Sequence, residues 1–208
     1  CGWGGFAKYA AEKYGCHITS VNISREQVVY ARNICQGLPV KIIHSDYRDV
    51  KGTFDKVVSI GMLEHVGYKN YRPFFFQVKN SLKKGSIALI HTIGSNYTTT
   101  GTDPWLDKYI FPGSKLPSLQ QVSCASEKYL IVEDIHNLSV NYDYTLMAWY
   151  DNFKKSWPQY EKKYGQKFYR MWTYYLLLCA GLFRARKTQL WQIVFSKGGL
   201  EGGYRSIR

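Results

Sequence analysis

The sequence lacks any apolar run that approaches the roughly 20 residues of a membrane-spanning helix, which excludes a transmembrane bundle. Acidic residues are also few, since 15 Asp and Glu stand against 28 Lys and Arg, for a formal net charge of +13. The five cysteines include no CxxC pair, which argues against a disulfide framework and a structural zinc site. With 208 residues, 45% hydrophobic and 21% charged, the composition is globular. We therefore expect a cytoplasmic protein with free thiols and no bound metal.

The positive charge is uneven along the chain. The net charge is +7 over residues 1–100, −4 over residues 101–153 and +10 over residues 154–208. A strongly basic surface attracts both anionic lipid head groups and nucleic acid. Charge by itself therefore leaves both partners open.

The first 91 residues alternate between helical and β-rich segments, which is typical of a mostly parallel sheet with helices on both faces. Residues 94–123 are rich in Gly, Ser, Thr and Pro, and they predict a long loop with a short helix that covers a site. A helical stretch over 142–185 is expected to break at Pro158. The remaining patterns predict helices over 4–14, 24–36 and 68–82, and strands over 17–22, 40–45, 54–60, 86–91, 130–137 and 189–196.

A glycine-rich turn, Cys1 to Gly5, opens the first helix. Such a turn lets the backbone approach a ligand beside the free N–H groups of a helix, although it also serves as a plain tight turn. A dinucleotide site would normally add an acidic residue at the end of the next strand, where this chain has Asn22. Ser24 and Gln27 predict a capping box at the second helix. A nicotinamide cofactor is therefore disfavoured.

Several segments in order along the whole chain resemble the cyclopropane-fatty-acid-phospholipid synthases, a branch of the S-adenosylmethionine-dependent methyltransferases. The most discriminating are GMLEHVG (61–67), HTIG (91–94) and CAGLFRAR (179–186). The others are CGWGG (1–5), VNISREQ (21–27), SDYRDV (45–50), DPWLDKYIFPG (103–113), NYDYTLMAWY (141–150) and the segments that flank the three discriminating ones. The resemblance implies a Rossmann-like class I methyltransferase fold, with residues 1–208 as the catalytic domain and a helical lipid-binding portion at about 142–185.

The resemblance also implies the chemistry. Such an enzyme transfers a methylene carbon from S-adenosylmethionine to the cis double bond of an unsaturated acyl chain in a membrane phospholipid, and closes a cyclopropane ring. In this family a bicarbonate ion is thought to remove the proton, and the matching positions are Glu64, His91, Ile93 and Tyr142. Without the resemblance, Glu64 also fits a solvated loop carboxylate and His91 a core histidine.

The cofactor positions follow from the same resemblance. They are Gly2, Trp3 and Gly4 for the methionine part, Asn22, Ile23 and Gln27 for the ribose and methionine, and Asp46 and Tyr47 for the adenine end. Amides of Asn and Gln can hydrogen-bond ribose hydroxyls without adding charge. Gln27 also suits its capping role, and Tyr47 also suits ordinary packing.

Cys179 matches the cysteine that is usually assigned to the active site of the family. Its neighbours Leu176 to Leu178 and Ala180 suit a small core residue equally well. Nothing in the sequence lowers the pKa of its thiol, so we expect it to line the pocket without acting as a nucleophile. Exposed lysines of the helical portion are candidate phospholipid contacts or part of a solvated face: Lys154, Lys155, Lys162, Lys163 and Lys167.

The glycine turn of this fold normally follows a first, central strand, and this sequence begins at the turn. We therefore expect a piece of a longer enzyme, with an open slot in the sheet and little activity on its own. The expected partner is unsaturated phospholipid at the inner face of the membrane, with a homodimer left open. Two alternatives are a methyltransferase that closes no ring and a non-catalytic basic module that binds nucleic acid through the last quarter of the chain.

Overall fold

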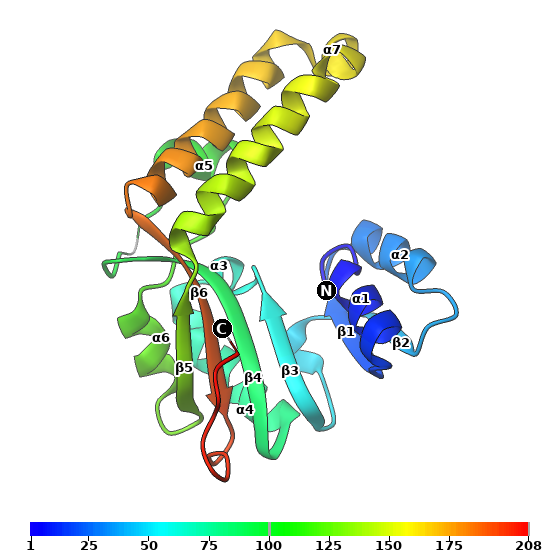
Figure 1. Ribbon diagram of the computed structural model, residues 1–208, viewed down its shortest axis with the longest axis vertical. Coiled ribbons are helices and arrows are strands. Elements are labelled where there is room, and N and C mark those ends of the chain that lie inside the picture. The colour runs from blue at the N-terminus through cyan, green and yellow to red at the C-terminus, as the bar shows by residue number, and fades with distance from the viewer. Residues whose placement is uncertain (100, 208) are drawn as a thin grey trace.

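The strands form two sheets in the computed structural model, which describes residues 1–99 and 101–207 (Figure 1). The smaller sheet pairs β1 (Ile18–Asn22) with β2 (Val40–His44) in parallel. The larger sheet has the order β3-β4-β6-β5, and only β6 runs against its neighbours. Its strands are β3 (Phe54–Ile60), β4 (Leu82–Ser95), β5 (Ile131–Asn137) and β6 (Thr188–Ser196).

The helices alternate with these strands, as the sequence pattern predicts. They are α1 (Gly5–Tyr14), α2 (Arg25–Ile34), α3 (Leu63–Val66), α4 (Tyr71–Ser81), α5 (Pro104–Tyr109), α6 (Leu119–Ser126) and α7 (Ser139–Arg184). Two short 3-10 helices, η1 (Tyr47–Asp49) and η2 (Tyr68–Asn70), lie in the connections. The α/β fold class is therefore confirmed.

Within residues 1–99 and 101–207 no strand pairing joins the two sheets, which leaves a slot beside β3. A cavity of about 390 Å³ lies there, lined among others by Val21 of β1, Ile43 of β2 and Phe54 of β3. Val58 and Ile60 of β3 are 39% and 51% exposed. Apolar side chains and strand edges are thus open to solvent at this slot.

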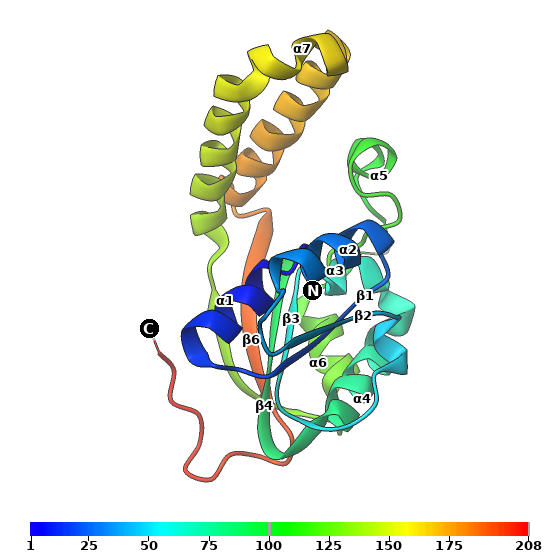
Figure 2. The ribbon, with the colours of Figure 1, turned by 90° about the vertical axis from the view of Figure 1, so that its right-hand side faces the viewer.

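The main core lies between the larger sheet and the helices α4 and α6, on the face turned to the right in Figure 2. Burial alternates along β4, so that Ala88, Ile90 and Thr92 face this core and are completely buried. The intervening residues Leu89, His91 and Ile93 face the other side of the sheet. His91 and Ile93 therefore share one face, near the carboxyl end of β4.

The prediction that the long helical portion breaks at Pro158 is wrong. The helix α7 continues through Pro158 and turns back at Gly165, which has φ 69° and ψ 168°. Glycine adopts this positive φ at little cost. Pro158 is exposed, so the carbonyl that it leaves unpaired four residues earlier can bind water. The result is an antiparallel helical hairpin that stands above the sheet (Figure 1).

Three smaller expectations also need correction. The strand β4 begins at Leu82 and ends at Ser95, so it is longer than the predicted 86–91. The segment 94–123 contains α5 and the start of α6 in addition to loop, because Asp103 and Ser118 cap those helices through side-chain hydrogen bonds. The box at α2 is only half formed, since Ser24 Oγ accepts from the backbone N–H of Gln27 while the side chain of Gln27 binds Asn22 instead.

Candidate functional site

Glu64 lies just beyond β3 on the short helix α3 and is only 6% exposed. Its Oε1 accepts a hydrogen bond of 2.7 Å from the backbone N–H of Ile93 on the neighbouring strand β4. Its Oε2 is buried and has no hydrogen-bond partner among the described residues. Burial raises the pKa of this carboxyl above its ordinary value. A buried acceptor without a partner is rare in folded proteins, and a functional role is one of its explanations.

Tyr142 and Cys179 lie at the base of the α7 hairpin, and the charge of Glu64 acts on Tyr142. Burial raises the pKa of the Tyr142 phenol, and the charge of Glu64 raises it further. Tyr142, Cys179 and Ile93 pack against the same apolar cluster, which includes Phe183 and Leu190. The ring of Tyr142 meets that of Phe183 edge-on, with centroids 5.0 Å apart. The structure thus places Tyr142, Cys179 and Ile93 against one apolar cluster, and the N–H of Ile93 links that cluster to Glu64.

His91 lies two residues before Ile93 on the same face of β4, as described above. Its backbone carbonyl accepts a hydrogen bond of 2.9 Å from the N–H of Gly61, which joins the carboxyl ends of β3 and β4. Burial lowers the pKa of its imidazole, so the neutral ring is favoured. A neutral imidazole can donate one hydrogen bond and accept another.

The sequence analysis missed the hydrogen bond between Glu64 and Ile93. The resemblance implies that the N–H of Ile93 helps to hold an anion, but here that N–H donates to Glu64. The parallel pairing of Ile60 with His91 places the start of α3 beside the end of β4. The hydrogen bond could therefore have been predicted from two features of the sequence. A glutamate follows one strand by a few residues, and a backbone N–H stands near the end of the parallel neighbouring strand.

The loop before α6 covers Glu64, as expected for a covering loop. The N–H of Lys115 donates to the backbone carbonyl of Glu64 at 2.8 Å, and the Tyr71 hydroxyl donates to the carbonyl of Lys115 at 3.2 Å. Desolvation and the nearby Glu64 raise the pKa of Tyr71 to about 12. Phe111 meets Tyr175 of α7 edge-on at 5.7 Å. The loop therefore joins α3 to the hairpin.

An ion pair that was not predicted from the sequence closes the base of the hairpin. Asp143, which is 7% exposed, accepts from Nε and one terminal nitrogen of Arg184 at 2.8 and 3.0 Å. The two residues stand at opposite ends of α7, next to Tyr142 and Phe183. This bidentate contact fixes how the two arms of the hairpin meet below the site.

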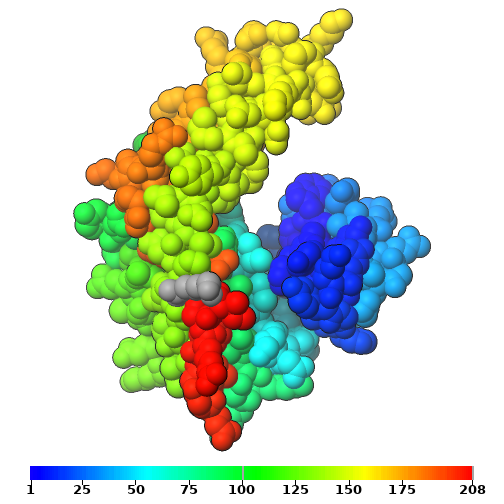
Figure 3. Space-filling view, viewed as in Figure 1, coloured from blue at the N-terminus to red at the C-terminus, as the bar shows by residue number. Residues whose placement is uncertain are grey.

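The predicted cofactor residues of the first 27 positions lie together. The side-chain amide of Asn22 donates to the carbonyl of Gly2 at 3.1 Å and to Oε1 of Gln27 at 2.6 Å. Trp3 is 56% exposed and stacks edge-on against Tyr30. Ile23 is 73% exposed. Figure 3 shows an open notch between this part of the chain and the α7 hairpin.

Gly4 explains why the turn before α1 requires glycine. Its φ is 87°, and a Cβ at this position would lie 2.8 Å from the Cβ of Ala31 on α2. Any side chain would therefore separate the two helices. The close packing of α1 on α2 holds the glycine turn beside Asn22.

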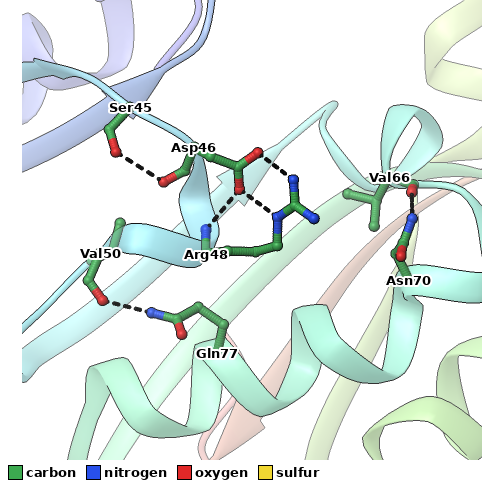
Figure 4. A network of polar contacts seen from close by, with 7 residues as sticks. All are labelled: Ser45, Asp46, Arg48, Val50, Val66, Asn70 and Gln77. Carbon is green, nitrogen blue, oxygen red and sulfur yellow. Dashed lines mark hydrogen bonds and ion pairs between the residues drawn. The ribbon is translucent and has the colours of Figure 1, made fainter.

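Asp46 and Tyr47 lie at the start of η1, and Figure 4 shows the contacts between Asp46 and Arg48. The Asp46 carboxylate accepts from Nε and one terminal nitrogen of Arg48 at 2.8 and 2.9 Å, and it also caps the Arg48 N–H. The Arg48 guanidinium holds the pKa of that carboxyl below its usual range. Tyr47 packs edge-on against Phe74 of the main core. The packing reading of Tyr47 is thus supported, and its cofactor role stays a prediction.

Two features of the described residues bear on other classes of function. No group of three or more His, Cys, Asp or Glu side chains is placed to hold a metal ion within residues 1–99 and 101–207. Over the same ranges, no helix combines the length and the apolar character needed to cross a bilayer.

Cys179 is expected to resist alkylation. Burial raises the pKa of its thiol to about 11, so only about one molecule in a thousand carries the reactive thiolate at pH 8. Iodoacetamide at pH 8 should therefore label the exposed Cys1, Cys16 and Cys124 first, as peptide mass spectrometry would show. Cys179→Ala should keep activity within about tenfold of wild type. Rapid labelling of Cys179 together with complete inactivation of the alanine variant would restore a nucleophilic role.

The sequence comparisons agree on one family. The family model for mycolic acid cyclopropane synthetase matches residues 1–193. The chain is 50% identical over 208 residues to the cyclopropane-fatty-acyl-phospholipid synthase of Escherichia coli K12, covering all of this chain and 54% of that protein. It is 32% identical over 216 aligned positions to a "probable fatty acid methyltransferase" of Pseudomonas putida, covering 97% of this chain and 54% of the relative. The chain thus spans about half the length of these relatives.

Solved structures show the same fold. The cyclopropane synthase MmaA2 of Mycobacterium tuberculosis superposes with a TM-score of 0.87 at 22% identity, over 95% of this chain and 75% of that chain. The mycolic acid cyclopropane synthase CmaA1, complexed with SAH and CTAB, gives a TM-score of 0.86 at 24% identity over the same shares. The likeness confirms the class I methyltransferase fold.

Proposed function

Because the chain belongs to the mycolic acid cyclopropane synthetase family, we propose that it is the catalytic portion of a cyclopropane-fatty-acyl-phospholipid synthase. The substrate would be a cis-unsaturated acyl chain of a membrane phospholipid, and the methyl donor S-adenosylmethionine. The family match and the 50% identity to the E. coli enzyme support this activity. The enzyme would work at the cytoplasmic face of the membrane as a peripheral protein.

One observation carries the proposal: Oε2 of Glu64 is buried and has no hydrogen-bond partner among the described residues. The charge of Glu64 acts on Tyr142, and His91 shares a face of β4 with Ile93, which donates to Glu64. A bicarbonate ion fits the donors here. Desolvation raises the pKa of the Glu64 carboxyl, and in its protonated form this group would donate a hydrogen bond to the anion. The Tyr142 hydroxyl and the neutral His91 ring would donate two more. The Ile93 N–H would add a fourth donor if Glu64 turned from it. Bound bicarbonate would supply a base that accepts a proton from the newly added methyl group.

The reaction places clear demands on this pocket. When the bond from carbon to the sulfonium sulfur breaks, the methyl carbon bonds to one alkene carbon, and the other carries positive charge. Loss of a methyl proton then lets the same carbon bond to that second centre and close the ring. The aromatic rings of Tyr142 and Phe183 offer negative π faces beside the cation. The buried setting of Glu64 keeps out water that would otherwise trap the cation.

The methyl donor, S-adenosylmethionine, would lie in the notch beside the glycine turn. Gly2, Trp3 and Gly4 would pass its methionine part, with Asn22, Ile23 and Gln27 at the ribose and methionine and Asp46 and Tyr47 at the adenine end. The contacts among Gly2, Asn22 and Gln27 support a shared binding surface. The apolar cluster of α7 around Cys179 would line the channel for the acyl chain.

A lipid methyltransferase without ring closure is the second candidate. The relative from Pseudomonas putida is named a fatty acid methyltransferase, so family membership alone does not imply a ring. Ring closure and transfer of an exocyclic methylene both add CH₂, which makes product mass a poor test. Proton NMR separates them, because cyclopropane ring protons resonate at unusually high field.

The proposal predicts bicarbonate-dependent methyl incorporation. The intact protein should transfer labelled methyl from S-adenosylmethionine into unsaturated phospholipid vesicles, and the rate should fall when bicarbonate and carbon dioxide are removed from the buffer. Returning bicarbonate should restore the rate in wild type but not in Glu64→Ala. An intact, folded protein that incorporates no label under either condition would refute the proposed function.

A further inference from the structure

The tip of the α7 hairpin lies far from the site described above. The first arm runs for 26 residues from Ser139 to the turn at Gly165, which is about 39 Å at 1.5 Å per residue. Tyr142 and Cys179 lie at the base, near the sheet. Figure 1 shows the tip extending beyond every other element. Residues 151–170, here called the hairpin tip, are therefore free to contact something other than the rest of the chain.

Aromatic stacking makes this arm rigid. Phe153 stacks on Tyr169 across the hairpin at 5.6 Å, and Trp157 stacks on Phe168 at 6.4 Å. Trp157 is only 7% exposed. Beyond these rings, Tyr160 and Tyr164 are 48% and 45% exposed, with their centroids 6.2 Å apart. Rings with an apolar body and a polar hydroxyl thus stand at the end of a stiff support.

The hairpin tip carries six cations and two carboxylates, Asp151 and Glu161. Glu161 already accepts a hydrogen bond of 2.7 Å from the side chain of Gln166. None of the six cations forms an ion pair with a carboxylate in the part of the chain that the structure describes. All six are exposed: Lys154, Lys155, Lys162, Lys163, Lys167 and Arg170.

We propose that the hairpin tip docks on the surface of an anionic phospholipid bilayer and tethers the enzyme there. The unpaired lysines would meet the charged head groups, while Tyr160 and Tyr164 would sit at the interface, where such rings are enriched. One leaflet contributes about half of the roughly 30 Å hydrocarbon core, much less than the length of the arm. An acyl chain therefore cannot reach Tyr142 through the tip, so the tether is separate from the substrate entrance. The role of this tether in catalysis rests on the proposed function, whereas binding of the hairpin tip to a bilayer can be measured independently of it.

Vesicle co-sedimentation tests the tether without any turnover. The intact protein is mixed with vesicles of phosphatidylglycerol and phosphatidylethanolamine, or of phosphatidylcholine alone, without S-adenosylmethionine. The charge variant replaces four lysines of the tip by glutamine, and a control variant does the same to four exposed lysines of the first 60 residues. The tip set is Lys155, Lys162, Lys163 and Lys167, and the control set is Lys13, Lys41, Lys51 and Lys56.

The charge variant should lose about 100-fold or more in binding to the anionic vesicles, since each lysine near such a surface strengthens binding roughly fivefold. The control set should lose much less. Tyr160→Ser with Tyr164→Ser should weaken binding several-fold while the melting temperature stays within a few degrees. Equal binding by tip and control variants would overturn the tether. So would tip-dependent binding of a single-stranded oligonucleotide that exceeds binding to anionic vesicles. Neither result depends on whether the enzyme makes cyclopropane.

Discussion

Replacing Glu64 by Gln should reduce kcat by about 10²- to 10³-fold while leaving the protein folded. The substitution keeps the shape of the side chain and an oxygen that can accept from the Ile93 N–H, but it replaces the acidic O–H donor by an amide N–H, which forms a weaker hydrogen bond to an anion. In our account the Glu64 carboxyl holds the anion that receives the proton. Steady-state rates of methyl incorporation by the intact protein would measure the loss. Binding of S-adenosylhomocysteine, measured by calorimetry, should be unchanged.

The same substitution should stabilise the protein at neutral pH. Burial raises the pKa of Glu64, so the folded state holds its proton more tightly than the unfolded chain, where a glutamate titrates near about 4.3. Wild type therefore loses stability as pH rises from there through the raised pKa, whereas the amide of the Glu64→Gln variant does not titrate. The melting temperature of the variant, relative to wild type, should climb across that window and then level off.

Glu127→Gln is the matched control, because Glu127 is exposed at the end of α6. It should change neither kcat nor the pH dependence of melting. If Glu64→Gln kept full activity, or if its relative stability were flat from pH 4 to pH 8, Glu64 would be an ordinary structural carboxylate.

Gly94→Ala, which adds one methyl group near the site, should strongly lower the free energy of unfolding. Gly94 lies on β4 directly after Ile93, and a Cβ there would overlap the indole ring of Trp191. Trp191 is 3% exposed and belongs to the main core, so its ring has no room to withdraw. We expect a loss of about 3 kcal/mol or more, or a fall of about 6–12 °C in melting temperature.

Two variants check that the clash is the cause. Gly181→Ala adds the same methyl group to α7, where nothing lies within 4 Å, so it should be neutral or slightly stabilising. Combining Gly94→Ala with Trp191→Leu should destabilise less than the sum of the two single changes, because the smaller side chain relieves the overlap. Strict additivity, or a Gly94→Ala variant that melts like wild type, would show that β4 moves away from Trp191.

The succession of helices and strands was predictable because the residue patterns are strongly periodic. An open slot in the sheet was also expected from the resemblance, and the two sheets are separate in the structure. The break in α7 was predicted at Pro158 but occurs at Gly165, because an exposed proline can leave a carbonyl to water whereas the reversal needs a positive φ. Local pattern carries no information about which of two helix breakers the tertiary contacts will use.

The site was only partly predictable. Chain order and resemblance pointed to Glu64, His91, Ile93, Tyr142 and Cys179, but not to the hydrogen bond that ties Glu64 to Ile93. That contact depends on the register of β3 on β4, and it joins residues 29 apart in sequence. The Asp143–Arg184 pair likewise links residues 41 apart and needs the hairpin to form. Such contacts arise from folding at long range, which motifs do not encode.

The central claim is that the pocket of Glu64, His91 and Tyr142 removes a proton from a transferred methyl group so that a ring can close. The most direct measurement supplies the intact protein with S-adenosylmethionine carrying a CD₃ group, and analyses the lipid product by mass spectrometry and NMR. The account predicts a cyclopropane ring that keeps two of the three deuterons. A branched acyl chain that keeps all three would contradict it.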